Sequence, residues 1–394
     1  MNSAVVAGDR TRSLPTAGLL IGIVLIGANL RAALTGVGAL LPTIERETGL
    51  SSAGSGVLGA LPLLIFAAVS PVVARMASRG SAQILLFALL GLIAGVLLRS
   101  AAGLWCLFAG TAILAVAITF GNVLLPSVLR ATLPERRIGW ATGAYVTAMT
   151  LAAAVSSGVS VPLSEHLPGG WRSALACWAV LAVTALLVWS GQQRRQVRAP
   201  AATAPAGMPW RSGLAWQVSV FMGLQSLGFY AIIAWLPSIV HDNGMSERAA
   251  GVLLFAFQLL GLLAVNLLPW LERWLGDQRL LAAGASALNA IGFLLLALAP
   301  RYALVSVLLI GLGAGVCLVL AMTFQSRRAR DAAQAAALAG MAQTVGFAVA
   351  AAGPLLLGLL HTLTAGWALA LLTLTAATLA QAVVGWGAGR DLRL

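Results

Sequence analysis

The sequence predicts an all-α protein that crosses a membrane twelve times. Two observations lead to this prediction. Of the 394 residues, 60% are hydrophobic and only 9% are charged, and the apolar residues gather in runs of about 20, the length that a helix needs to cross roughly 30 Å of hydrocarbon. Soluble domains usually carry about 25% charged residues, so the composition excludes an ordinary soluble enzyme. It also excludes a disordered chain, which requires low hydrophobicity.

Twelve apolar segments are long enough to span a bilayer. Their predicted limits are 17–44, 53–74, 82–98, 102–129, 139–164, 172–190, 215–240, 248–271, 280–298, 302–326, 335–361 and 365–388. The first segment follows Arg10 and Arg12, as a signal peptide would. It is too long for one, however, and has no small-residue cleavage site before Arg31.

The charged residues indicate how these segments are oriented. The net charge of +13 comes from 24 basic residues, all of them arginine, against 11 acidic ones. The arginines are scattered between apolar runs rather than clustered with aromatic residues, so we expect a lipid bilayer and no nucleic acid as partner. With the N-terminus in the cytoplasm, 18 arginines fall on the cytoplasmic side and five, Arg99 among them, in the opposite loops. The positive-inside rule therefore predicts that both termini are cytoplasmic.

An internal repeat divides the chain into two sets of six spans. Residues 191–214 break the hydropathy with arginine, proline and glycine and predict a cytoplasmic linker between bundles at 1–190 and 215–394. A shift of 195 positions lays residues 41–58 on 236–253 with eight identities in 18 positions. Because six spans separate the two copies, the halves have the same orientation and are related by a pseudo-two-fold axis along the membrane normal. Such halves bind their substrate between them, near mid-membrane.

One charged residue lies inside a predicted span. Arg31 is about 13 residues, or roughly 20 Å, from either end of its segment, too far for its side chain to reach the surface. Burying this charge costs at least about 2.5 to 3.5 kcal/mol, and such residues usually mark a substrate pathway. The alternative is an arginine held by backbone carbonyls or side-chain amides. All 11 acidic residues fall in loops or at span ends, so an anion, or a solute with an anion-like polar edge, is the expected counterpart.

Other polar side chains interrupt apolar spans and could complete a binding site with Arg31. These predicted substrate-binding residues are Asn122, Tyr145, Gln225, Tyr230, Gln258 and Gln343, with Trp235 and Phe347 as wall residues, and Thr323 and Gln325 interrupt spans in the same way. Pockets typically combine apolar walls with a few oriented donors. For each of these residues, hydrogen bonding between helices or ordinary packing remains the alternative.

No pattern in the sequence predicts a metal site, a cofactor or a catalytic residue. The three histidines, His166, His241 and His361, lie at external span ends far apart in the chain and are expected to be exposed in loops. The three cysteines fall within spans without metal-like spacing. Hydrolase motifs such as GxSxG and HExxH do not occur, so we expect a protein that is not an enzyme.

Several longer strings together resemble one family. They are LRAALTGVGALLPTI, GNVLLPSVLRATLP, GAYVTAM, SGLAWQVSVFMGLQSLGFYAIIAWLPSI and QAAALAGMAQTVGFAVAAAGPLLLG. The chain resembles, over essentially its whole length, the cyanate and nitroimidazole transporter group of the major facilitator superfamily. The resemblance implies a monomeric twelve-helix transporter of the bacterial inner membrane, working by alternating access, in a group whose members are associated with cyanate or 2-nitroimidazole. Arg31, Asn122, Tyr145, Gln225 and Gln343 fall within the shared strings.

The superfamily's loop signature is degraded in this chain. VVARMASRG, residues 72–80, keeps Arg75 and Arg79 of G-x-x-x-D-R-x-G-R but has no aspartate. This departure weakens any inference about how the cytoplasmic gate is latched.

We therefore expect a secondary transporter of a small anionic or polar solute, such as a cyanate-like anion, a small carboxylate or a nitro-heteroaromatic compound. The alternative is an exporter of neutral heteroaromatic compounds. A sensor or receptor is less favoured because the linker of about 24 residues leaves no room for a signalling domain. A monovalent anion that enters a cell with an inside-negative potential must overcome an electrical free energy of about 2.3 kcal/mol per 100 mV. Protons are the candidate coupling ion, carried on the substrate itself, unless coupling is absent.

Overall fold

The computed structural model describes residues 17–76, 81–191, 207–330 and 332–394, and these residues form helices joined by short turns, without a strand. The first half contains α1 (Ala17–Thr48), α2 (Ser52–Met76), α3 (Ser81–Arg99), α4 (Leu104–Thr132), α5 (Glu135–His166), α6 (Trp171–Ala176) and α7 (Trp178–Ser190). The second half contains α8 (Gly213–Asp242), α9 (Glu247–Leu275), α10 (Gln278–Leu298), the 3-10 turn η1 (Pro300–Tyr302), α11 (Ala303–Arg327), α12 (Ala332–Thr364) and α13 (Ala368–Ala388).

The predicted all-α membrane architecture is confirmed. Within the described ranges, eleven helices are long and apolar enough to span a membrane, and a shorter apolar helix, Gln83–Arg99, provides the twelfth span. Each predicted span agrees with the structure to within four residues at either end. The sixth span differs in one respect, because it is divided at Cys177 into α6 and α7.

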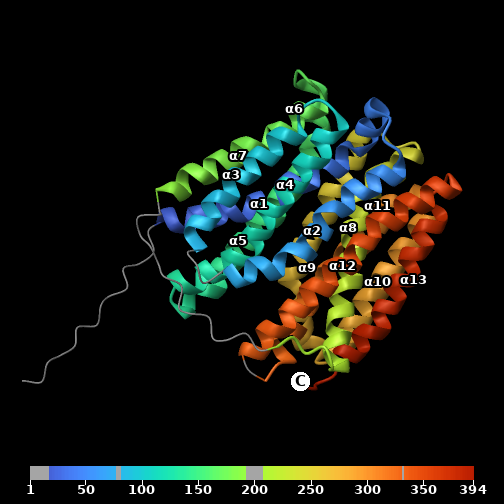
Figure 1. The fold of residues 1–394 in the computed structure, drawn as a ribbon. Helices are drawn as coiled ribbons and strands as arrows, with labels where there is room; N and C mark the ends of the chain where they lie inside the picture. Colours follow the sequence, from blue (N-terminus) through green and yellow to red (C-terminus); the bar gives the residue numbers. More distant parts are fainter. Residues whose placement is uncertain (1–16, 77–80, 192–206, 331) are drawn as a thin grey trace, which may run out of the picture.

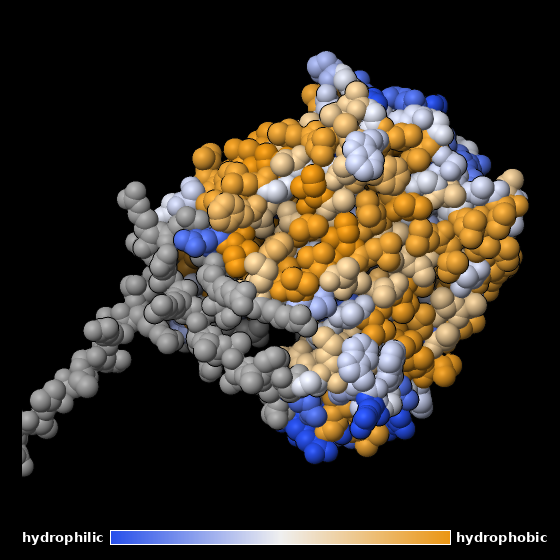
Figure 2. Space-filling view, in the orientation of Figure 1, coloured by the Kyte–Doolittle hydropathy of each residue, from blue (hydrophilic) through white to orange (hydrophobic). Residues whose placement is uncertain are grey.

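The surface carries the band expected of a protein embedded in lipid. Figure 2 shows hydrophobic residues across the middle of this face and hydrophilic residues gathered at its two ends. Exposed tryptophans mark both ends of the helices: Trp105 at the start of α4, and Trp270 and Trp274, whose rings stack at 6.1 Å, near the end of α9. Tryptophan favours the boundary between lipid and water, so these residues delimit the membrane-spanning zone.

The helices pack in two groups that meet along a few pairs. α1 packs on α5 and α3 on α4 in the first half, and α8 packs on α12 and α10 on α13 in the second. The halves meet where α2 contacts α12, α5 contacts α9 and α1 contacts α8 (Figure 1). Most of the predicted linker, together with the end of the 72–80 loop signature, lies outside the described residues. The domain limits 1–190 and 215–394 therefore stay a prediction.

The repeat seen in the sequence recurs in the backbone of the first turn of each half. Gly49 and Gly244, which are 195 positions apart, both have positive φ, at 69° and 88°, a conformation that glycine adopts without steric cost. Two residues further on, the hydroxyls of Ser51 and Ser246 accept a hydrogen bond of 3.2 Å from a backbone N–H of the next helix. The two turns are therefore built in the same way, as the repeat predicts.

A second pair of contacts repeats between the halves. The indole Nε1 of Trp171 donates to Glu47 at 2.9 Å, and that of Trp367 donates to Asp242 at 2.7 Å. In each half a tryptophan at the start of the last span thus binds an acidic residue at the end of the first. Such charge-assisted hydrogen bonds are stronger than neutral ones and fix the ends of these helices together.

Candidate functional site

A cavity of about 760 Å³ lies between the two halves. Its walls come from α1, α2, α4 and α5 of the first half and from α8, α9, α11 and α12 of the second, with Arg99 of α3 in addition. Of the lining residues, 30 are apolar or glycine, with leucine the most frequent, and 17 carry a polar side chain. This composition is typical of pockets for small molecules.

The cavity is closed toward the turns that contain Gly49 and Gly244, here called the Gly49 end. There α1 and α8 approach so closely that a Cβ on Gly38 would collide with the carbonyl oxygen of Ile233. Lining residues on this side, such as Leu41 and Leu58, are buried. At the opposite end, where α7 and α8 are linked, the lining residues Asn122, Met322 and Ser326 are exposed, so the cavity is accessible from the linker end.

Polar contacts between the halves reinforce the closed end. Glu247 of α9 accepts from Arg46 at 2.9 Å and from Thr43 at 2.7 Å, both on α1. Ser52 of α2 lies 3.1 Å from Nδ1 of His361 on α12. These contacts must break for the cavity to open at the Gly49 end.

Arg31 lies in the cavity wall, near the middle of α1. Its guanidinium carbon is 4.6 Å from the ring centroid of Phe229 on α8, a cation–π contact between the halves. Within the described residues the guanidinium forms no ion pair and no side-chain hydrogen bond that would hold it, so the alternative of an arginine fixed by carbonyls or amides gains no support. Its donors remain available to a molecule in the cavity.

The structure brings seven of the other predicted site residues to the same cavity. They are Asn122, Tyr145, Gln225, Tyr230, Gln258, Gln343 and Phe347, and Thr323 and Gln325 join them. Two of the amides are partly engaged. Gln225 accepts a 3.2 Å hydrogen bond from Ser226, and Gln258 donates to the Ala153 carbonyl at 3.0 Å and to Ser157 at 2.8 Å. Gln258 therefore ties α9 to α5, and its Oε1, which is buried without a partner, is the atom left to accept.

Trp235 does not line the cavity, which corrects its expected place as a wall residue. Its side chain is fully buried in the second half, where Nε1 donates to the Pro354 carbonyl at 3.0 Å and the ring packs 5.1 Å from Trp367. An aromatic residue inside an apolar span has the same appearance in the sequence whether it faces a cavity or a neighbouring helix. In this structure the Trp235 side chain packs against neighbouring helices.

The expectation that the histidines are exposed in loops is wrong for His361. Its side chain is only 21% exposed, and its ring stacks on Trp367 at 4.0 Å between centroids. His241 is also half-buried, with Nδ1 buried and unpartnered, whereas His166 is exposed. His361 is drawn inward because α12 extends through the Gly49 end and packs on α2, a tertiary contact that the span limits do not reveal.

The sequence did not predict two kinds of residue that surround the cavity. Phe229 and Phe257, whose rings are 5.5 Å apart, lie in apolar spans and carry no signal that separates them from ordinary packing residues. The sequence predicts an external loop position for Arg99, because it ends an apolar run. The structure corrects this, since its side chain is fully buried and lies at the border of the cavity.

The charged side chains around the cavity, among the described residues, are all positive. Arg31 lines the cavity, the buried Arg99 borders it, and none of its described lining residues is acidic. Unpaired positive charges between apolar walls attract anions more strongly than the same charges would in water, because the local dielectric is low. The arrangement can thus hold a small solute by an anionic or electron-rich edge, with aromatic rings against its faces.

Comparison with known proteins assigns the chain to a class. Residues 19–351 match the model of the Major Facilitator Superfamily, and the chain belongs to that family. It is 41% identical to the 2-nitroimidazole transporter of Escherichia coli over 95% of both chains, and 28% identical to the cyanate transport protein CynX of the same organism over 89% of this chain and 91% of the relative. The resemblance drawn from the sequence strings is thereby confirmed.

Solved structures show the same fold. A bacterial homologue of the human lysosomal transporter Spinster, in an inward-facing and unoccupied conformation, superposes with a TM-score of 0.79 over 98% of both chains at 14% identity. The chain is therefore a multi-pass membrane transporter of small solutes and not an enzyme.

Proposed function

We propose that this protein transports a small anion, or a planar solute with an anion-like polar edge, by alternating access, and that Arg31 anchors that edge. The observation that supports this most directly is the Arg31 guanidinium, which lies in the cavity over Phe229 without an ion pair among the described residues. A guanidinium presents a planar fork of donors that matches the two oxygens of a carboxylate, nitrate or nitro group.

The remaining polar residues would orient the solute. Asn122 and Tyr145 line the cavity from the first half, and Gln225, Tyr230 and Gln343 line it from the second. A solute bound by both sets would connect the halves at mid-depth, and it would favour the conformation in which both sets can reach it. Gln258 would contribute its free Oε1 and Phe347 an apolar wall.

We propose further that the linker end faces the cytoplasm of a bacterial inner membrane, that the protein works as a monomer, and that the bundles are 1–190 and 215–394, joined by 191–214. The arginine distribution supports this orientation. Because none of the described lining residues is acidic, any coupled proton would travel with the substrate rather than on a cavity carboxylate.

Export of neutral heteroaromatic compounds, nitroimidazoles among them, is the second candidate function. The rings of Phe229, Tyr230 and Phe347 at the cavity favour an aromatic solute, and the 2-nitroimidazole transporter is 41% identical to this chain. In this case Arg31 would donate hydrogen bonds to a nitro oxygen, and the transporter would act as an exporter.

A ligand panel separates these candidates. Purified protein is tested for thermal stabilisation by cyanate, nitrate, small carboxylates, amino acids and nitroimidazoles, because a ligand that binds the folded state raises the melting temperature. Stabilisation by the anions alone supports anion transport, and stabilisation by nitroimidazoles alone supports the second candidate. Stabilisation by amino acids alone would contradict both.

A further inference from the structure

Arg99 is buried in a way that a purely structural arginine is not. It ends α3, its side chain has no exposed surface, and Nη1 donates to the Ala33 carbonyl of α1 at 2.5 Å. Its Nε and Nη2 are buried without a hydrogen-bond partner. Buried donors without partners are costly, and those of a charged group especially so.

The burial of Arg99 is built into the packing of α3 and α4. Gly110 of α4 lies against the Arg99 backbone so closely that a Cβ at position 110 would collide with the Arg99 nitrogen. This approach covers the end of α3 and leaves the side chain directed toward α1. Ala33, its acceptor, is two residues from Arg31 in the direction of the Gly49 end. Arg99 borders the cavity that Arg31 lines, but its guanidinium has no surface open to it, so an anion reaches Nε and Nη2 once the neighbouring side chains move.

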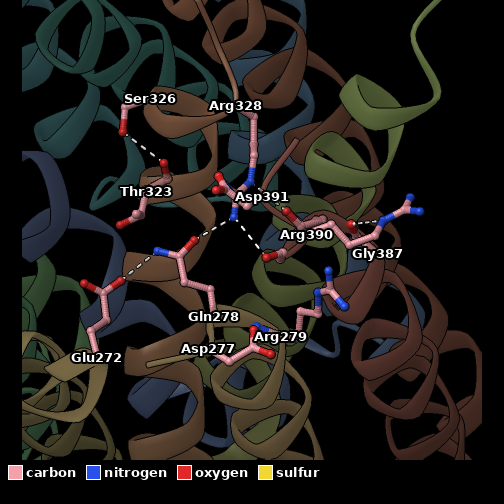
Figure 3. Close-up of polar contacts among 12 residues, drawn as sticks. Glu272, Asp277, Gln278, Arg279, Thr323, Ser326, Arg328, Gly387, Arg390 and Asp391 are labelled. Carbon is pink, nitrogen blue, oxygen red and sulfur yellow. Dashed lines mark hydrogen bonds and ion pairs between the residues drawn. The ribbon is translucent and has the colours of Figure 1, made fainter. Parts of the chain in front are cut away.

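Arg328 shows how the same protein satisfies a buried arginine that holds helices together. It is 3% exposed, and all three of its guanidinium nitrogens have partners (Figure 3). Nε donates to the Ala388 carbonyl at 3.0 Å, Nη2 donates to Gln278 at 2.6 Å and to the Gly389 carbonyl at 3.1 Å, and Nη1 lies 3.6 Å from Asp391. Arg99, by contrast, uses one nitrogen of three and forms no ion pair within the described ranges.

We propose, building on anion transport as the proposed function, that Arg99 forms a second anion-binding position in the cavity, on the Gly49 side of Arg31. Its ligand is a small monovalent anion that accepts hydrogen bonds from Nε and Nη2. The ligand class follows from the chemistry of the site: a guanidinium cannot lose its proton in a protein, its two remaining nitrogens only donate, and none of the described lining residues is acidic. Two anions held at neighbouring positions would repel each other, so each would ease the release of the other.

The number of anions bound per protein tests this second position. Binding of radiolabelled thiocyanate, a small linear monovalent anion, is measured at equilibrium on purified protein in gluconate buffer without chloride. The wild type is expected to bind two thiocyanate ions, Arg99→Met one, Arg31→Ala one and the double variant none. Arg328→Met is the matched control, since it removes a buried arginine outside the cavity and should leave two bound.

The melting temperature in gluconate alone separates a binding role from a structural one. Arg99→Met should melt at or above the wild-type temperature, because an apolar side chain of similar length removes an uncompensated buried charge. Arg328→Met should melt lower, because it leaves its former acceptors unpaired. If Arg99→Met does not fold, iodide soaked into wild-type crystals serves instead, with an anomalous peak expected beside Nη2 of Arg99.

The outcomes for the two arginines are distinguishable. A folded Arg99→Met protein that still binds two thiocyanate ions, or an iodide peak at Arg31 and none at Arg99, overturns the second position while leaving the proposed function intact. If Arg31→Ala binds two ions and Arg99→Met binds one, the proposed role of Arg31 is overturned and the anion position at Arg99 is supported.

Discussion

The guanidinium carbon of Arg31 lies 4.6 Å from the ring centroid of Phe229, and this contact joins the first helix of one half to the first helix of the other. A cation over an aromatic ring gives up part of its hydration but keeps its in-plane donors free. The ring of Phe229 therefore positions the Arg31 side chain without using the N–H groups that a substrate would need.

Replacing Phe229 should weaken transport without abolishing it. A cation–π contact contributes about 0.5 to 2 kcal/mol, so Phe229→Leu is expected to raise the KM for uptake into proteoliposomes by roughly 2- to 30-fold. Phe229→Trp should retain wild-type affinity, because tryptophan is the best partner for a cation. Equal KM values for the leucine variant and the wild type would show that the ring does not position Arg31.

Closure of the Gly49 end depends on the absence of a side chain at Gly38. The alanine Cβ would collide with the Ile233 carbonyl oxygen, so Gly38→Ala should prevent α1 and α8 from meeting there and should lower transport at least about tenfold, because the step that alternates access is blocked. Gly284→Ala is the control, since a Cβ at that position meets nothing within 4 Å.

Labelling reports the conformation of the Gly38 variant directly. A cysteine introduced at Leu58, which is buried in the cavity wall of the wild type, should react with a water-soluble thiol reagent faster in Gly38→Ala than in the parent. The three native cysteines are first replaced by serine or alanine. Unchanged labelling together with wild-type transport would mean that the helices tolerate the added methyl group.

The ion pair between Arg46 and Glu247 should bias the conformation only modestly. The two side chains are 62% and 18% exposed, and exposed pairs contribute about 0.2 to 1 kcal/mol. Glu247→Gln should therefore shift the equilibrium away from closure of the Gly49 end by roughly 1.4- to 5-fold, as measured by the distance distribution between spin labels on α1 and α9.

A similar ion pair within one half provides the control for Glu247→Gln. Arg327 and Glu272 are 3.5 Å apart, with side chains 58% and 23% exposed, but both belong to the second half. Glu272→Gln should leave the distance distribution unchanged. A shift of equal size in both variants would show that the effect comes from the change in net charge rather than from the loss of the contact between Arg46 and Glu247.

The fold was predictable because its signal is local. Each span is a run of apolar residues as long as the bilayer is thick, and this constraint places helix ends to within a few residues. The repeat was visible because Gly49 and Gly244 both occupy a turn with positive φ, where other residues are strained. The division of the sixth span at Cys177 was not predictable, because the apolar run continues through it without a glycine or proline.

The site was predictable only where a polar residue stands out against an apolar background. Arg31 and the amides are visible on these grounds, and the cavity collects them. Phe229 is invisible in the sequence because aromatic residues also fill ordinary helix contacts, and Trp235 was misplaced for the same reason. Arg99 was misassigned because a charge at the end of a span usually lies in water. Its burial depends on the approach of Gly110, which is a tertiary contact.

The measurement that tests the central claim most directly is substrate counterflow in proteoliposomes with variants of Arg31, using the ligand identified by the thermal panel. Arg31→Ala should lose transport and ligand-induced stabilisation together, and Arg31→Lys should recover little of either, because the ammonium keeps the charge but lacks the planar fork. Normal counterflow by folded Arg31→Ala would contradict the claim that Arg31 anchors the substrate.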